Sequence, residues 1–512
     1  MKRFLLFIFL VLYLFSSAIY ADNNDQLYIT SKSFFSVKPI FRPTSPEMVS
    51  IKRDRVNVDE ERKLSADLIF YGGQSFGEER LARYFLPYGK SEVAVGELGS
   101  NFVKQENVDV IANYFGILSY NLYKVGAPVG NTLNNYTFES KLSFRPKQTF
   151  YGATLAFKQH VSKYPDKGFW YEIVVPFEHV KNDMHLKETI IKSGGPNGND
   201  PKVPAGFVAN MTQAFKQTSW LYGKIDGPQS KTGIADPYLR GGLVFVNDET
   251  HYLDSFMGIS FPTGNVPTSE FVWEPLVGNG GHATAFFGTS AGFRVWSKCE
   301  RSLFFEFDTA GTVYFDNHQT RSFDLKDKQW SRYMWVYLDK KSTTTSPGIN
   351  TFTRRVNVSH GSIRDLNTAY IYKHGGLQLE TGYHFFGRQS EQVRLVREWE
   401  KGPAIASIIN NNNDFIAGSV SRDNATIKEY LRIKNDSIGD QETYRAIEES
   451  DLDLDSAAHP SVIAHTLYGT ISYHCEIAKY PTYFGAGGSY EFSSNNDALE
   501  RWMIWGRFGM YF

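Results

Sequence analysis

Apolar and polar residues alternate along most of the chain after residue 66. In the segment 376–388, for example, Leu377 and Leu379 alternate with Gln378 and Glu380. A period of two predicts β-strands with one apolar and one polar face. Several of these runs are longer than the roughly 5–6 residues common in soluble proteins, and they match the roughly 9–11 residues that a membrane-spanning strand needs.

The runs predict an all-β protein, a closed antiparallel transmembrane β-barrel of about 12–16 strands with long loops on one side. The strongest candidates are 136–145, 151–161, 169–178, 237–247, 253–262, 284–296, 301–315, 330–338, 376–388, 467–474, 482–492 and 501–512, with weaker ones near 66–71, 93–99 and 109–118. The long polar connections are 180–230, 262–283, 339–375 and 389–465. A soluble sandwich has the same local pattern with its apolar face inward, and is the alternative fold.

The N-terminus has the pattern of an export signal. A basic start is followed by an apolar run over 4–15 and by small residues, so cleavage after Ala18 or Ala21 would remove residues 1–21. An uncleaved helical anchor is the alternative. Residues 22–65 then form a lead-in segment, either a solvated arm or a partial plug of the lumen, and 66–512 form the barrel.

The C-terminal strand ends on an aromatic residue. Phe508, Met510 and Phe512 share one face, and no polar tail follows them. A bare apolar edge promotes aggregation unless it is paired, as the last strand of a barrel is paired with the first. This ending resembles the assembly signal that the outer-membrane insertion machinery recognises. We therefore expect a cell outer membrane location, with outer-membrane lipid and that machinery as partners; a buried final strand of a periplasmic β-domain is the alternative.

Three segments in the middle of the chain have a recognisable order. They are Gly-Ile-Ala-Asp-Pro-Tyr-Leu-Arg-Gly-Gly-Leu-Val-Phe from Gly233, Phe-Met-Gly-Ile-Ser-Phe-Pro-Thr-Gly ending at Gly264, and Leu-Val-Gly-Asn-Gly-Gly ending at Gly281. The series resembles that of the outer-membrane barrel family named after the phenol-degradation meta-pathway, whose members are regarded as channels for hydrophobic compounds. Ala235 departs from the pattern, which usually has Gly there. The resemblance implies a barrel and a transport role, and brings no catalytic residues.

Composition excludes several classes of protein. The formal net charge is −1, so the chain lacks the basic excess that marks nucleic-acid binding, and we expect no nucleic-acid partner. The mean hydropathy of −0.35 excludes a polytopic helical membrane protein. Two cysteines, Cys299 and Cys475, are too few for a thiolate zinc site, and are either isolated residues or one disulfide.

The polar faces of the predicted strands define a candidate lumen. The candidate lumen-lining residues are Glu139, Lys141, Arg145, Lys158, Glu172, Arg240, Asp254, Arg294, Glu306, Asp308, Glu380, His384, Arg388, Glu491 and Arg507. Charged rings of this kind set selectivity in pores, so we expect a passive, porin-like channel for small solutes. The same residues could instead form paired ladders that fill a closed interior, since the lumen width is not determined by the pattern.

Enzymatic motifs are weak in this chain. The segment 288–292 matches G-x-S-x-G, but a nucleophile elbow needs a strand–turn–helix context and this segment lies within a predicted strand. The acidic residues Asp451, Asp453 and Asp455 lack the spacing of a calcium loop. We therefore expect no enzyme, cofactor or metal. The alternatives are an outer-membrane enzyme of the lipase or protease type, and a structural or adhesive barrel with an occluded lumen.

Overall fold

The computed structural model describes most of the chain. The described residues are 31–51, 64–96, 109–117, 120–122, 134–136, 138–161, 168–193, 207–339, 345–407, 416–417, 446–493 and 498–512. The predicted signal peptide, residues 1–21, lies outside them. Among the described residues no helix is long and apolar enough to cross a membrane.

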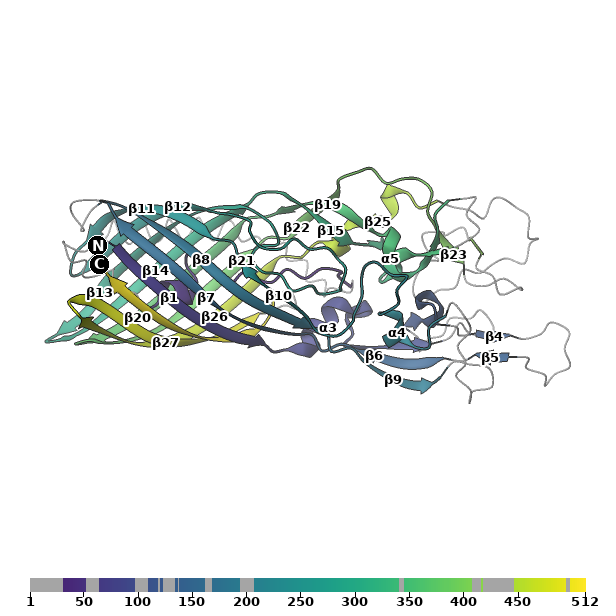
Figure 1. The fold of residues 1–512 in the computed structure, drawn as a ribbon, viewed down its shortest axis with the longest axis horizontal. Helices are drawn as coiled ribbons and strands as arrows, with labels where there is room; N and C mark the ends of the chain where they lie inside the picture. The colour runs from purple at the N-terminus through teal and green to yellow at the C-terminus, as the bar shows by residue number, and fades with distance from the viewer. Residues whose placement is uncertain are drawn as a thin grey trace.

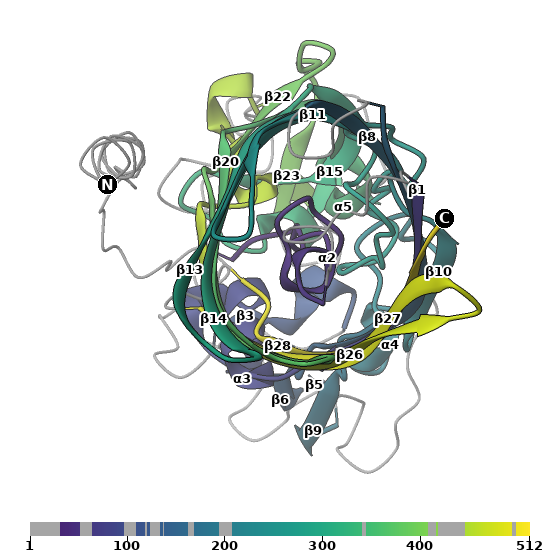
Figure 2. The ribbon, with the colours of Figure 1, turned by 90° about the vertical axis from the view of Figure 1, so that its left-hand side faces the viewer.

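Twelve antiparallel strands close into a barrel (Figures 1 and 2). In order around the wall they are β1 (Leu64–Ser75), β7 (Lys147–His160), β8 (Gly168–Asp183), β11 (Tyr238–Asn247), β12 (His251–Ser260), β13 (Thr284–Lys298), β14 (Arg301–Tyr314), β20 (Ile363–His374), β21 (Leu377–Arg388), β26 (Val462–Ile477), β27 (Tyr480–Ser493) and β28 (Arg501–Tyr511). Strand β1 closes the ring, because it pairs with β28 on one side and with β7 on the other. The predicted all-β closed barrel of about 12–16 strands is therefore confirmed.

A short extra strand, β10 (Gln229–Ile234), continues the line of β11. It pairs with the end of β8 that extends beyond β11, with Gln229 opposite Asn182. The break between β10 and β11 falls at Ala235–Pro237, where proline cannot donate to the ladder.

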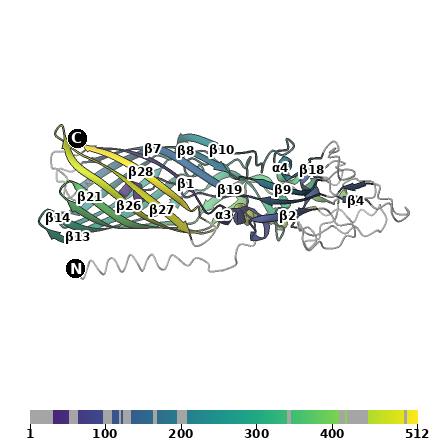
Figure 3. The same cartoon turned by 90° about the horizontal axis from the view of Figure 1, so that it is seen from below.

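The two ends of the barrel differ (Figure 3). One end carries the start of β1, the end of β28 and short connections, such as the two residues Cys299 and Glu300 between β13 and β14. The connections at the other end are long and carry further secondary structure, such as the residues between β14 and β20. Short turns on one side and long loops on the other match the prediction.

The outer surface of the barrel wall is apolar. Met257, Phe287 and Ile504 are 71%, 59% and 61% exposed, and neighbouring residues along each strand are buried. Strand β28 shows this alternation along its length: Arg501, Met503 and Trp505 are buried, whereas Trp502, Ile504 and Phe508 are exposed. Large apolar side chains thus face outward and the alternate, more polar positions face the interior.

The long connections fold together into a compact region that we call the cap (Figure 1). Its strands are β2 (Glu92–Gly96), β3 (Val110–Ile111), β4 (Tyr120–Leu122), β5 (Asn134–Tyr136), β6 (Glu139–Ser143), β9 (Lys187–Lys192), β15 (Asn317–Ser322), β16 (Asp324–Leu325), β17 (Trp335–Tyr337), β18 (Thr345–Pro347), β19 (Thr353–His360), β22 (Glu391–Leu395), β23 (Ala404–Ser407), β24 (Ile416–Ala417) and β25 (Leu452–Asp453). Its helices are α3 (Glu78–Phe85), α4 (Met211–Ala214) and α5 (Gly348–Thr351).

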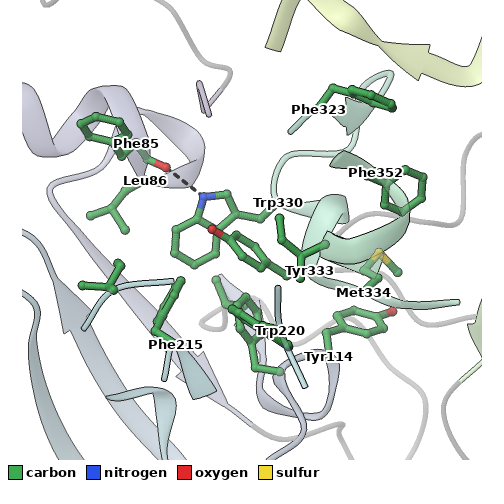
Figure 4. Packing of buried hydrophobic residues seen from close by; sticks show 14 of the residues in the cluster. Phe85, Leu86, Tyr114, Phe215, Trp220, Phe323, Trp330, Tyr333, Met334 and Phe352 are labelled. Carbon is green, nitrogen blue, oxygen red and sulfur yellow. Dashed lines mark hydrogen bonds between the residues drawn. The ribbon is translucent and has the colours of Figure 1, made fainter. Parts of the chain in front are cut away.

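An aromatic core stabilises the cap (Figure 4). Trp330 lies at its centre, 1% exposed, and packs against Phe215 and Tyr333. Its indole N–H donates to the carbonyl of Phe85 over 2.8 Å, so the polar atom of this buried ring is paired. Residues from connections far apart in the sequence thus share one core.

Four predicted barrel strands belong to the cap instead. The segment 136–145 contains β6, which pairs with β2 and β9 in a separate four-stranded sheet, and the weak candidates 93–99 and 109–118 contain β2 and β3 of the same sheet. The segment 330–338 forms a 3-10 turn over Ser331–Tyr333 and the short β17. A period of two shows that a strand has an apolar face, and the cap core buries such a face as well as lipid does.

One barrel strand was predicted as loop. Strand β20 lies within 339–375, which we expected to be a long polar connection. Its outward positions include Arg364 and Thr368 as well as Tyr370, so its apolar face is too weak to stand out in the sequence.

The chain before β1 enters the barrel. Residues 31–35 contact the cap, where Phe35 belongs to its core. Residues 36–51, the luminal segment, lie inside the barrel, and the short helix α2 (Pro46–Val49) is central when the barrel is seen end-on (Figure 2). Every residue from Ile40 to Ile51 is buried. Over these residues the chain is neither solvated nor extended in solution.

Candidate functional site

The interior of the barrel is the candidate site, and its wall is charged. Twelve of the predicted lumen-lining residues lie at interior positions of barrel strands: Lys158, Glu172, Arg240, Asp254, Arg294, Glu306, Asp308, Glu380, His384, Arg388, Glu491 and Arg507. All but Arg294 are buried. Arg294 lies near the end with short turns, where its nearest carboxylate is Glu249 at 4.0 Å.

Many of these wall residues hold the luminal segment. Arg42 of the segment pairs with Asp365 on β20, with 2.5 Å from Nη2 to Oδ1 and 3.2 Å from Nε to Oδ2. His384 on β21 lies 3.0 Å from the same carboxylate and 3.3 Å from the guanidinium. Because two parallel contacts fix a guanidinium against a carboxylate, this pair sets the position of the segment along the barrel.

A second group of contacts lies around the helix α2. Arg240 forms an ion pair with Glu172 and donates to the carbonyl of Pro43 over 3.3 Å. Arg507 pairs with Asp67 over 3.0 Å and donates to the carbonyls of residues 48 and 50. Wall guanidinium groups therefore satisfy backbone carbonyls that would otherwise be buried without partners.

Near the cap, the segment contacts two more charged residues of the wall, one cation and one anion. Arg388 on β21 donates to the hydroxyl and the carbonyl of Ser36 over 2.9 and 3.2 Å. Lys38 forms an ion pair with Glu491 on β27, whose other oxygen lies 3.5 Å from Nε of Arg501. The luminal segment is thus attached to the wall along its whole length.

The cap contributes a buried polar cluster above the same part of the lumen. Arg321 lies 3.4 Å from Glu391, and His360 lies 3.6 Å from the other oxygen of that carboxylate. His282 and His360 approach to 3.2 Å between their Nε2 atoms. Burial lowers the pKa of His360 to about 3, and although burial raises that of Glu391, Arg321 and His360 hold the pKa of this carboxyl at about 2.

The connection from β12 to β13 is fixed to the wall by residues of the three glycine-containing segments that begin at Gly233 and end at Gly264 and Gly281. Asp236, at the break between β10 and β11, accepts from the backbone N–H of Gly264 over 3.0 Å and of Asn279 over 2.6 Å. Gly278 has φ +78°, and a Cβ there would lie 2.7 Å from the Asp236 carboxylate. Glycine is therefore required at this close approach, which brings Asn279 and His282 to the mouth of the barrel.

Small cavities remain beside the luminal segment. One of about 40 Å³ lies where the segment, the barrel wall and the cap meet, and one of about 20 Å³ lies beside α2. Lys38, Ile40 and Arg501 line both. Volumes of this size hold a few water molecules or one small ion, so at these two places the segment nearly fills the lumen.

Three predicted lumen residues lie outside the barrel wall. Glu139 and Lys141 are on β6 in the cap, where they pair with Lys192 and Glu92. Arg145 follows β6, is exposed, and lies 3.4 Å from Glu79. Their alternation with apolar residues reflects the cap core, which buries Phe138, Leu142 and Phe144.

Sequence reasoning missed the partners of the wall. Ser36, Lys38 and Arg42 lie in a proline-rich stretch without periodicity, so no pattern pointed to the lumen. Arg501 could have been found, because it alternates with the outward residues of β28, as Arg507 does.

The remaining candidates do not converge on a catalytic or metal centre. Ser290 of the G-x-S-x-G match lies within strand β13, with Asp254 and Asp308 opposite it on the neighbouring strands. The cysteines are both free. Within the described ranges, no three His, Cys, Asp or Glu side chains are arranged to hold a metal ion.

These features define a class: a closed β-barrel with an apolar exterior, a charged interior and a capped lumen occupied by its own N-terminal segment. No family model and no curated protein matches the chain. Among solved structures it is similar to an outer membrane channel from Pseudomonas putida F1, with 10% identity, a TM-score of 0.40, and 90% of this chain and 99% of that chain covered.

Two further similarities are lower. A Pseudomonas aeruginosa FadL homologue has 7% identity and a TM-score of 0.28, with 88% of this chain and 90% of that chain covered. The CymD monoaromatic hydrocarbon channel has 8% identity and a TM-score of 0.26, with 95% and 98% covered. At this level of similarity, the functional assignment rests on the residues of this chain.

Proposed function

We propose that the chain is an outer-membrane β-barrel that serves as a passive channel for small solutes, closed by its luminal segment in the conformation described above. The observation that supports this most directly is the inversion of the wall, with apolar side chains outside and charges inside. In water, an uninterrupted apolar band around the barrel would be far larger than the patches that soluble monomers expose. In an outer membrane, the same band faces lipid.

The direction of insertion follows from the two ends of the barrel. Membrane barrels of bacteria have short turns on the periplasmic side and long loops outside. The cap therefore lies at the cell surface, and the chain ends at the periplasmic side. Phe508 and Phe512 point outward from the last strand, 45% and 48% exposed, as an assembly signal for the insertion machinery requires.

Transport rather than catalysis is supported by the distribution of the polar groups. The buried charges follow the lumen axis, from Arg388 near the cap to Asp67 on β1, and they contact the luminal segment through its backbone and its charged side chains. The segment is held both by these polar contacts and by a buried apolar cluster that includes its Phe41, Met48 and Ile51, and both kinds of contact are exchanged for water and solute when it moves. Such a lumen opens when the segment moves.

A second function, a structural or adhesive barrel with an occluded lumen, is favoured by one observation. The ion pairs that hold the segment, such as Arg42 with Asp365, are buried and cost several kcal/mol to break singly. If the segment never leaves, the cap becomes the working surface of the protein.

Planar bilayer recordings separate the two functions. The wild-type protein is compared with Arg42→Ala, which removes the bidentate contact to Asp365, and with Arg394→Ala on the exposed face of β22 as the matched control. For a channel closed by its segment, we expect low or intermittent conductance for the wild type and for Arg394→Ala, and a higher open probability for Arg42→Ala. Absence of conductance in all three proteins, each shown to be folded by a heat-modifiable gel shift, would reject the channel.

A further inference from the structure

The cavity of about 40 Å³ at the mouth of the barrel carries an excess of positive charge. Its cationic lining residues are Lys38, Arg321, Arg388 and Arg501, and its carboxylates are Glu178 and Glu391. The two histidines of its lining, His282 and His360, are buried and have lowered pKa values, so they are neutral near pH 7. The cavity thus holds more cations than anions.

Arg388 has the clearest deficit of negative charge. It is 5% exposed, and its hydrogen-bond partners are Ser36 and a ring nitrogen of His459, which are neutral groups. Among the described residues, no carboxylate lies within ion-pair distance of it, and its Nε–H has no hydrogen-bond partner. A buried guanidinium without a counter-ion is costly, so an anion at this place would stabilise the structure.

Arg501 supplies a second unsatisfied donor to the same cavity. Its Nε lies 3.5 Å from Glu491, but that carboxylate also pairs with Lys38. Its Nη1 has no hydrogen-bond partner within the described residues, and the residue is 6% exposed. Two cations therefore share one carboxylate.

The carboxylates of the lining are near enough to these two arginines to attract them, but within the described residues neither forms a hydrogen bond or a close ion pair with them. Glu391 is paired with Arg321 at 3.4 Å, and the backbone N–H of His459 donates to it as well. Glu178 lies on β8 and interacts with Tyr71 and the backbone of Gly278. Unsatisfied N–H groups of Arg388 and Arg501 thus remain on residues that line this cavity.

We propose that this cavity is a binding site for one small monovalent anion, a halide or a short-chain carboxylate, held by Arg388 and Arg501. Guanidinium groups form their strongest hydrogen bonds with anionic acceptors, and the volume suits a group of a few heavy atoms. The site includes Ser36, so the anion also fastens the luminal segment to the wall at the cap end. Binding at this site does not depend on whether the barrel conducts.

Chloride line broadening in NMR tests the site with the full-length protein in a zwitterionic detergent. We expect saturable excess broadening of the chloride signal, displaced by acetate but not by the bulkier gluconate. In Arg501→Gln, binding should weaken about tenfold, the loss expected for removing one hydrogen bond to a charged group. Arg394→Gln, an exposed arginine on β22, serves as the matched control and should bind as the wild type does.

Two results would overturn the proposal. The first is wild-type protein without a saturable chloride component, which decides the matter even if a variant fails to fold. The second is binding by exposed lysines and arginines, shown either by displacement by gluconate as effective as by acetate or by chloride binding in Arg388→Gln and Arg501→Gln equal to that of the wild type. A heat-modifiable gel shift verifies the fold of each variant before the titration.

Discussion

The barrel and the cap present different kinds of residue at their outer surfaces. The cap has the ordinary arrangement, with Trp220, Trp330 and Tyr333 packed in its core and charges such as Arg394 and Glu398 at its surface. The barrel buries Arg240 and Glu172 and exposes Phe287 and Ile504. Both regions are built from alternating strands, so the difference lies in the medium that each face contacts.

This comparison shows what alternation determines and what it leaves open. Strand β6 of the cap and strand β21 of the barrel have the same period of two. In β6 the apolar residue Leu142 is buried, whereas in β21 the apolar Leu379 is 40% exposed. Alternation assigns the two faces of a strand, and only the closure of the sheet shows which face meets lipid, core or lumen.

The largest effect is expected from breaking the charged interior of the barrel. Asp365→Ala leaves Arg42 buried without its carboxylate and should weaken docking of the luminal segment by about 3–5 kcal/mol. Replacing both residues by apolar ones, Arg42→Met with Asp365→Leu, should recover most of this loss. Limited proteolysis of the segment measures both, and equal cleavage of the wild type and Asp365→Ala would contradict a segment held by this pair.

A loss of stability of similar size is expected in the cap when an apolar side chain, and not a charged one, is removed. Trp330→Ala creates a cavity in the aromatic core and should destabilise the cap by about 3–5 kcal/mol. Because the barrel strands do not depend on this core, the heat-modifiable gel shift should persist while hydrogen exchange rises in the cap segments. Loss of the gel shift would show that the two regions fold as one unit.

A smaller effect distinguishes the outer faces of the two regions. Ile504 on β28 and Ile190 on β9 are both exposed, at 61% and 46%. Ile504→Arg should destabilise the barrel in lipid vesicles by about 2–4 kcal/mol, because it places a charge against hydrocarbon. Ile190→Arg should change stability by no more than about 0.5 kcal/mol, because that surface faces water. Urea unfolding in vesicles measures the difference, and equal effects would place both faces in one medium.

Much of the barrel could be predicted from the sequence, whereas for residues 22–65 a partial plug was only one of two alternatives and the contacts of the luminal segment could not be predicted. Long strands such as β7, β8 and β28 have outward residues that are almost all apolar, so a local pattern reveals them. Strand β20 carries Arg364 on its outer face and was missed. The contact of Arg42 with Asp365 joins residues more than three hundred positions apart, and no local pattern encodes such a pairing.

A separate prediction concerns the pH dependence of cap stability. His360 has a pKa of about 3 in the folded cap and about 6.5 when exposed. The open cap therefore binds more protons than the closed one between these values, and cap stability should fall as the pH is lowered from about 6.5 towards 3. Glu391, with a folded pKa of about 2, contributes stability that is present above its ordinary pKa and is lost as the pH falls towards 2.

Hydrogen exchange in β19 and β22 as a function of pH measures this loss. His360→Gln should flatten the pH dependence between 6.5 and 4, while His318→Gln, at an exposed position of β15, should leave it unchanged. The same pH dependence in His360→Gln and the wild type would assign the effect to other groups.

The account depends on which medium the apolar face of the barrel contacts, and spin-label accessibility along β28 measures this directly. Single cysteines are placed at residues 502 to 508 in a background with Cys299→Ser and Cys475→Ser, and the protein is inserted into lipid vesicles. Labels at Trp502, Ile504 and Phe508 should be accessible to oxygen and protected from a water-soluble nickel reagent, whereas labels at Met503 and Trp505 should be protected from both. If the nickel reagent reached the outward positions as readily as oxygen does, the result would contradict a membrane barrel.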